Sequence, residues 1–206
     1  MPTQRNRTFV LAAGLLVIGT AVHAGVPDPR FSVIEPHLVG NSTGTLMLNG
    51  LPGDQPGFEV TLRDVNNAPI PNVAVTLDFS NAPTLHLYSS QNGGTTVNCA
   101  ARTLSRMTDA QGKVAFGARF GGYSNTAAVE VDSAGTNLLT TVPARSTDLD
   151  GAGGRTDAND LNLFRSALFG AFRPECDFTV DGAVNAADLV LFKNEIFSGE
   201  VQTYCP

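Results

Sequence analysis

The clearest chemical signal in the sequence comes from oxygen-bearing side chains spaced along a twelve-residue segment. They occupy its first, third, fifth, ninth and twelfth places: Asp177, Thr179, Asp181, Asn185 and Asp188. Gly182 stands at the sixth place, where a sharp turn favours a residue without a β-carbon, and the carbonyl of Ala183 follows at the seventh. A hard divalent cation takes about six to eight oxygen ligands, so this spacing predicts a calcium-binding loop.

A second acidic segment, upstream, follows the same pattern less closely. Its acidic residues are Asp148, Asp150, Asp157 and Asp160. Ala152 stands where the other loop has Asp181, and this segment is one residue longer. We expect weaker calcium binding here because one charged ligand is missing, and the sequence leaves open whether one or two ions bind. For the loop over residues 177–188 the alternative is an acidic turn that caps a helix.

A tandem duplication joins each acidic segment to a predicted helix. Residues 157–165 and 185–193 correspond at a constant offset of 28 residues. Apolar residues recur at helical spacing in both copies: Leu161, Phe164 and Leu168 in the first, and Leu189, Phe192 and Ile196 in the second. Neither stripe is large enough to form a core alone, so the two copies should pack on each other.

From about residue 26 to residue 144, apolar and polar residues alternate with a period of two. The clearest example is the run Val73, Val75, Leu77 and Phe79, and clusters of Gly, Pro and Asn separate such runs. This pattern is typical of short strands with one buried face. Roughly seven or eight such strands favour an antiparallel β-sandwich, which makes the chain mainly β with a small α module at its end.

The β-rich region resembles the bacterial immunoglobulin-like domains of surface and secreted proteins. The resemblance lies in residues 58–79, where a P-x-P turn separates two strands, and in residues 108–116, which run T-D-A-Q-G-K-V-A-F. It implies an immunoglobulin-like β-sandwich over residues 25–144 that serves as a spacer or an adhesive module. Such a fold carries no chemistry by itself.

The two loop–helix copies, each with aspartate at the last loop position, resemble the type I dockerin domain over about residues 146–199. The resemblance implies EF-hand-like loops with two calcium ions and a pair of antiparallel helices. It also implies docking onto a cohesin domain of a scaffold or surface protein in polysaccharide-degrading assemblies. The family's partner contacts carry over to Ala158, Asn159, Arg165 and Ser166, and to Ala186, Ala187, Lys193 and Asn194. Helix solubility is the alternative explanation for the two basic residues.

Residues 1–24 have the features of a secretory signal peptide. Arg5 and Arg7 precede an apolar stretch over residues 9–22, and small residues precede a predicted cleavage site before Gly25. The alternative is a membrane anchor, but the stretch is shorter than the ~20 residues that span a bilayer. We therefore expect a secreted, extracellular protein without a membrane span, and cell-surface association stays open.

The chain has three cysteines, Cys99, Cys176 and Cys205, and all of them lie after the predicted signal peptide. Export implies an oxidising compartment in which disulfides persist. Because Cys176 and Cys205 bracket the last module, residues 145–206, we predict that they form a disulfide. Three free thiols are the alternative.

Net charge and the surroundings of the histidines argue against two classes of function, nucleic-acid binding and catalysis. The 206-residue chain has a formal charge of −6 and a pI near 4.9, which argues against nucleic-acid binding. Neither His37 nor His86 belongs to a recognisable catalytic pattern, so we predict that the protein is not an enzyme.

The leading hypothesis is a secreted, non-catalytic modular protein with a calcium-dependent docking module at residues 145–206. The alternative is an extracellular adhesin, or a glycan- or protein-binding immunoglobulin-like module, in which the calcium domain is a stabilising cap. In that case Tyr88 and Tyr123 are candidates for a sugar-binding surface. A polysaccharide-degrading enzyme is the third and least favoured hypothesis.

Overall fold

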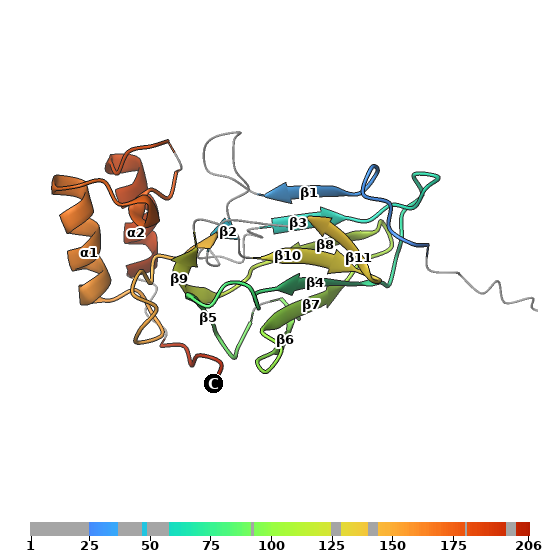
Figure 1. The fold of residues 1–206 in the computed structure, drawn as a ribbon, viewed down its shortest axis with the longest axis horizontal. Coiled ribbons are helices and arrows are strands. Elements are labelled where there is room, and N and C mark those ends of the chain that lie inside the picture. Colours follow the sequence, from blue (N-terminus) through green and yellow to red (C-terminus); the bar gives the residue numbers. More distant parts are fainter. Residues whose placement is uncertain are drawn as a thin grey trace, which may run out of the picture.

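The computed structural model describes residues 25–36, 47–48, 58–91, 93–124, 129–139, 144–179, 181–196 and 201–206. The predicted signal peptide, residues 1–24, lies outside this range, as does His37. Strands make up one end of the molecule and two helices lie at the other (Figure 1). The prediction of a mainly β chain with a small helical part is confirmed.

Twelve strands in the described residues form three hydrogen-bonded sheets. The largest has the order β11-β10-β4-β7-β6: Thr136–Leu139, Glu130–Ser133, Ala74–Asp78, Thr103–Met107 and Thr96–Asn98. The second is β1-β3-β8: Val33–Pro36, Phe58–Thr61 and Lys113–Phe116. The third is β2-β12-β9-β5: Met47–Leu48, Ala144–Arg145, Phe120–Ser124 and Leu85–Leu87. Neighbouring strands pair antiparallel except β2 and β12, which pair in parallel.

One hydrophobic core joins the three sheets, because alternate residues of each strand point inward. In β4, Val75 and Leu77 are fully buried while Ala74 is exposed, which confirms the period of two that the sequence shows there. The other sheets add buried residues to the same cluster: Val60, Leu85, Phe116 and Phe120.

The helices form a second, smaller core of their own. Helix α1 runs over Ala158–Phe169 and α2 over Ala186–Ile196, with a short 3-10 turn, η1, at Pro174–Cys176 between them. Phe164 of α1 is fully buried and stacks on Phe192 of α2, with 4.8 Å between ring centroids. The prediction that the two copies pack on each other is therefore confirmed. Leu189 is an exception to the predicted stripe: it is 38 % exposed, and Leu191 contacts the core instead.

The predicted disulfide between Cys176 and Cys205 is wrong. The structure joins Cys205 to Cys99, 106 residues away in the chain, and Cys176 is a buried free thiol. The reason is packing: the Cys176 side chain belongs to the helical core, whereas the backbone N–H of Cys205 donates to the carbonyl of Leu87 in β5 at 2.7 Å. That pairing places Cys205 at the sheet. Within the described residues, no helix has the length and apolar character needed to cross a membrane.

Candidate metal centre

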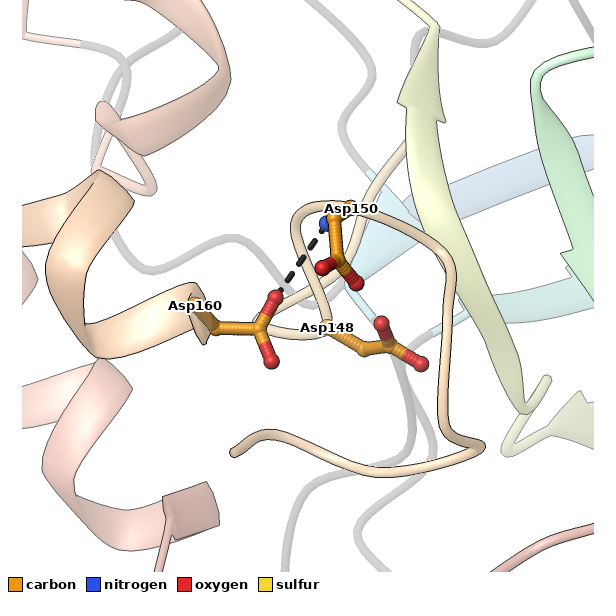
Figure 2. Close-up of side chains that lie close together, drawn as sticks. All are labelled: Asp148, Asp150 and Asp160. Carbon is orange, nitrogen blue, oxygen red and sulfur yellow. Dashed lines mark hydrogen bonds between the residues drawn. The ribbon is translucent and has the colours of Figure 1, made fainter. Parts of the chain in front are cut away.

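Each acidic segment folds into a compact cluster of three carboxylates. The first contains Asp148, Asp150 and Asp160, and the second contains Asp177, Asp181 and Asp188. In each cluster the candidate ligand oxygens lie within 4.8 Å of one another. Figure 2 shows Asp160 reaching from the start of α1 toward the two loop aspartates of the first cluster. Like charges this close repel one another, so a cation between them can bind favourably, and either cluster could hold a metal ion.

In the first copy, the last aspartate of the loop, Asp160, joins the loop to the helix that follows it. Asp160 is fully buried and caps the N-terminus of α1 through a reciprocal pair of hydrogen bonds with Asp157. One Asp160 oxygen accepts the Asp157 N–H at 2.7 Å, and the other accepts the Leu149 N–H at 2.7 Å. Asp160 therefore holds the beginning of the loop against the beginning of the helix.

Asp188 does the same in the second copy. Its Oδ2 accepts the N–H of Asn185 at 2.9 Å, and its Oδ1 accepts the N–H of Thr179 at 2.8 Å. The Thr179 hydroxyl also donates to Oδ1, at 3.1 Å. The duplication seen in the sequence is thus repeated in the hydrogen bonds, which supports a common role for the two loops.

The first aspartate of each loop is held differently. In the second loop, Asp177 accepts the backbone N–H groups of Asp181 at 3.2 Å and of Gly182 at 3.0 Å. Gly182 has a φ of +87°, a left-handed conformation that favours glycine, as the sequence predicts. Within the described residues, both hydrogen bonds to the Asp177 carboxylate therefore come from its own loop.

Asp148 instead receives its hydrogen bonds from outside the loop. Its Oδ2 accepts the hydroxyl of Tyr88 at 2.9 Å and also the hydroxyl of Tyr204. Its Oδ1 is buried and has no hydrogen-bond partner among the described residues. An unpartnered carboxylate oxygen inside a protein is costly, and a bound cation would satisfy it.

Burial also changes the titration of this site. It raises the pKa of Asp148 to about 7, against the lowering effect of the two tyrosine hydroxyls, and it raises the pKa of Asp160. Burial raises the pKa of the Tyr88 and Tyr204 phenols as well, so both stay protonated and act as donors. A cation would compete with a proton for Asp148 in the neutral pH range.

The sheet also contacts the second loop. Arg145 at the end of β12 is buried, and its guanidinium donates to the backbone carbonyl of Asp177. Burial lowers the pKa of Arg145, while the nearby carboxylates of Asp177 and Asp188 act in the opposite direction. The sequence did not predict that Arg145, Tyr88 and Tyr204 contact the acidic loops, because no local pattern marks a residue that reaches a loop from a distant part of the chain.

The remaining predicted ligands lie around the clusters. Asp157 is the N-cap of α1 and accepts the N–H of Asn159 at 2.7 Å, so its carboxylate is not among the three that converge in the first cluster. Asn185 accepts the N–H of Ala187, and its side-chain amide donates to Asp181 at 2.8 Å. Ala183 is exposed, and its N–H donates to the Asp181 carboxylate.

The predicted partner-binding residues all lie on exposed surface of the two helices: Ala158, Asn159, Arg165, Ser166, Ala186, Ala187, Lys193 and Asn194. Three large apolar side chains of these helices are exposed with them: Phe169 at 82 %, Val190 at 57 % and Leu189 at 38 %. Tyr88 is only 2 % exposed, so it cannot form part of a sugar-binding surface.

Comparison with protein-family models, with characterised proteins and with solved structures finds no match for this chain, so its function is argued from the site itself.

Proposed function

We propose that residues 145–206 form a calcium-binding module, like a type I dockerin domain with EF-hand-like loops, that docks a secreted protein onto a partner. The observation that carries the proposal is the repeated construction of the two loops. In both, three carboxylates converge and the last aspartate binds the start of the loop and the start of the helix. A simple acidic cap would need only the helix contact.

The donor set favours calcium over softer metals. The candidate ligands in both clusters are carboxylates, with the Thr179 hydroxyl beside the second, and oxygen donors suit hard cations. In each cluster the middle aspartate, Asp150 or Asp181, is exposed while the other two are buried, which leaves a path for an ion from solvent.

Exposed basic residues on the two helices support the proposal that this module docks onto a cohesin-type domain. Arg165 and Lys193 stand at matching places of the two copies, and both are exposed on a chain with a formal charge of −6. Two basic side chains on an acidic protein can steer it onto an acidic partner surface. We further propose that residues 25–144 form an immunoglobulin-like β-sandwich that acts as a non-catalytic spacer, in keeping with antiparallel sheets around one core.

One observation favours the alternative, in which the helical part is a stabilising cap on a binding module. Tyr88, Tyr204 and Arg145 join the helical part to the sheets through buried or part-buried hydrogen bonds. A module that only docks needs no such attachment.

Calorimetric titration of residues 25–206 with calcium tests the metal site. Asp181→Ala is expected to lower the affinity of the second site at least tenfold, because it removes a charged ligand. The matched control is Asp132→Asn on β10, away from both clusters, which is expected to leave the titration unchanged. Equal binding by Asp181→Ala and the wild type would refute the ligand assignment.

Docking is tested with a recombinant cohesin domain from the producing organism. The full chain is expected to bind it in calcium, to release it in EDTA, and to lose it when Arg165 and Lys193 are both changed to Ala. Binding that survives the double substitution would reject this docking face. Binding of a different partner, independent of calcium, would favour the alternative.

A further inference from the structure

The two loops differ in how they hold their first aspartate, and the difference involves the sheet. In the second loop the N–H of Gly182 reaches the Asp177 carboxylate directly, at 3.0 Å. In the first loop the N–H of Gly154 donates to the Tyr204 hydroxyl at 3.2 Å, and that hydroxyl donates to Asp148. In the first loop the Tyr204 hydroxyl therefore lies between the glycine N–H and the aspartate carboxylate, whereas in the second, shorter loop these two groups bond directly.

Tyr88, the residue that follows β5, provides a second hydroxyl to Asp148. Its hydroxyl donates to the same Asp148 oxygen, Oδ2, at 2.9 Å. With Oδ2 taken by two hydroxyls, Oδ1 is left buried, without a hydrogen-bond partner in the described part of the chain, on a side chain that is fully buried. The carboxylate belongs to the cluster with Asp150 and Asp160, so a cation there is the ligand that this oxygen lacks.

Gly121 in β9 makes room for the contact between Asp148 and Tyr204 because it has no β-carbon. A β-carbon at Gly121 would lie 2.6 Å from Asp148 Oδ2 and 2.7 Å from the Tyr204 hydroxyl. The N–H of Gly122 donates to the Asp148 carbonyl at 2.7 Å. Asp148 is thus held from the sheet at both its backbone and its side chain.

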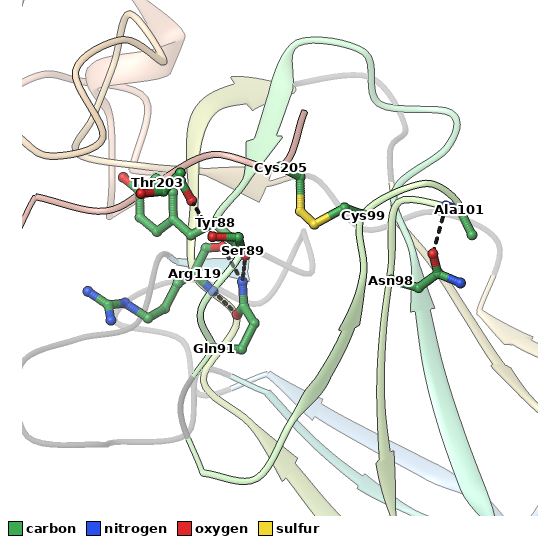
Figure 3. The surroundings of a disulfide bond; sticks show 9 residues. All are labelled: Tyr88, Ser89, Gln91, Asn98, Cys99, Ala101, Arg119, Thr203 and Cys205. Atoms are coloured by element: carbon green, nitrogen blue, oxygen red, sulfur yellow. Dashed lines mark hydrogen bonds between the residues drawn. A yellow bond between two sulfur atoms is a disulfide. The ribbon is translucent and has the colours of Figure 1, made fainter.

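Tyr204 reaches the site because the C-terminal segment, residues 201–206, is fastened to the sheet. The N–H of Ser89 donates to the carbonyl of Thr203 at 2.8 Å, and the next residue but one on the segment, Cys205, is bonded to Cys99 (Figure 3). On the other side, the N–H of Gln202 donates to the carbonyl of Gly154 at 2.8 Å. The segment therefore contacts the sheet and the first loop at once.

We propose that Tyr88 and Tyr204 are positioning residues of the first cation site, which is built jointly by the first loop, the sheet and the C-terminal segment. The inference rests on the proposed calcium binding and goes beyond it, since it makes occupancy of the first site depend on attachment of residues 201–206. The second site, whose first aspartate is held within its own loop, does not share this dependence.

Terbium(III), which replaces calcium in oxygen sites, is the probe. The chain has no Trp and three Tyr, so emission excited through tyrosine reports an ion close to a phenol. In residues 25–206 we expect such emission, displaced by calcium. Asp148→Asn is expected to abolish it, while Asp177→Asn is expected to leave it, because among the cluster carboxylates in the described residues the hydroxyls of Tyr88 and Tyr204 bond to Asp148 alone. Emission that survives Asp148→Asn would overturn the proposal.

Calcium titration of Tyr204→Phe and Tyr88→Phe tests the positioning role. Each is expected to weaken the first site about 10–100-fold, the usual effect of removing a group that orients a metal ligand, with the second site unchanged. Tyr123→Phe is the matched control, since its hydroxyl bonds to neither cluster in the described structure. The unchanged second site and the circular dichroism spectrum verify that the variants fold.

The outcomes separate this proposal from the one on which it rests. Loss of all calcium binding in the wild type would refute the calcium module itself. Calcium at the second site together with a first site that is absent, or that is indifferent to both tyrosine substitutions, would overturn the positioning role and leave the calcium module standing.

Discussion

Replacing Phe164 with alanine is expected to unfold the helical part of the protein when calcium is absent. The Phe164 ring is fully buried, with centroids 4.8 Å from Phe192 and 6.0 Å from Phe178. Truncation of a buried Phe to Ala costs about 3–5 kcal/mol, because apolar area is exposed and a cavity remains. The stacked geometry places the expected cost in the upper half of that range.

The helical core is too small to absorb such a loss. The segment 145–196 has about 50 residues, and native stability is about 0.05–0.15 kcal/mol per residue, which corresponds to about 3–8 kcal/mol. Most of that is removed by the substitution. Calcium at about 100 times its dissociation constant restores about 2.7 kcal/mol per site, so the helices should refold at least partly when calcium is added.

The assay is urea unfolding followed by helical circular dichroism, with and without calcium. Phe169→Ala is the matched control: it lies five residues further along the same helix, but its side chain is 82 % exposed. It is expected to change stability by less than about 0.5 kcal/mol. If the two substitutions shift the unfolding midpoint equally, the assignment of Phe164 to the helical core is wrong.

Three further predictions follow from the same structure. Chelation with EDTA is expected to reduce the helical signal of α1 and α2 while the β signal persists, because bare carboxylate clusters repel; an unchanged helical signal would contradict coupled folding. Under native conditions Cys176 should resist alkylation, since burial raises the pKa of its thiol to about 12, and non-reducing peptide mapping should recover Cys99 linked to Cys205 rather than any peptide linked to Cys176. The calcium-free protein should melt at a higher temperature at pH 5.5 than at pH 8: the folded-state pKa of Asp148, about 7, lies above its usual 3.8, so its contribution to stability is present at low pH and is lost as the pH rises through 7. Asp148→Asn should reduce this difference, and a wild-type protein that melts higher at pH 8 would contradict the sign.

Much of the architecture was predictable because its causes are local. The period of two at Val75 and Leu77 marks one buried strand face, and the strand is where the pattern puts it. The repeat at Phe164 and Phe192 predicted two helices that pack on each other, and their rings stack. Leu189 was misplaced because a helix eleven residues long can rotate by part of a turn to suit its neighbours, and helical spacing does not show which edge of the apolar stripe faces out.

The candidate site divides in the same way. Asp177, Asp181 and Asp188 lie within twelve residues, so their spacing alone was enough to predict that their carboxylates converge. Asp157 and Asn185 stand at matching places just before α1 and α2, and each accepts the N–H of the residue two further along the chain, so a ligand role for either stays a prediction. The contacts of Tyr88 and Tyr204 with Asp148 were not predictable from spacing, because both tyrosines lie far from the first loop in the chain.

The sequence by itself determined the two acidic loops, the helices that follow them and the β-rich region before them, because each depends on residues close together in the chain. Tertiary structure alone decided that Tyr88 and Tyr204, 60 and 56 residues from Asp148, bind its carboxylate, and that Cys205 pairs with Cys99 across 106 residues. Such contacts arise from how the C-terminal segment packs on the sheet edge, and that packing depends on the whole core rather than on any local spacing.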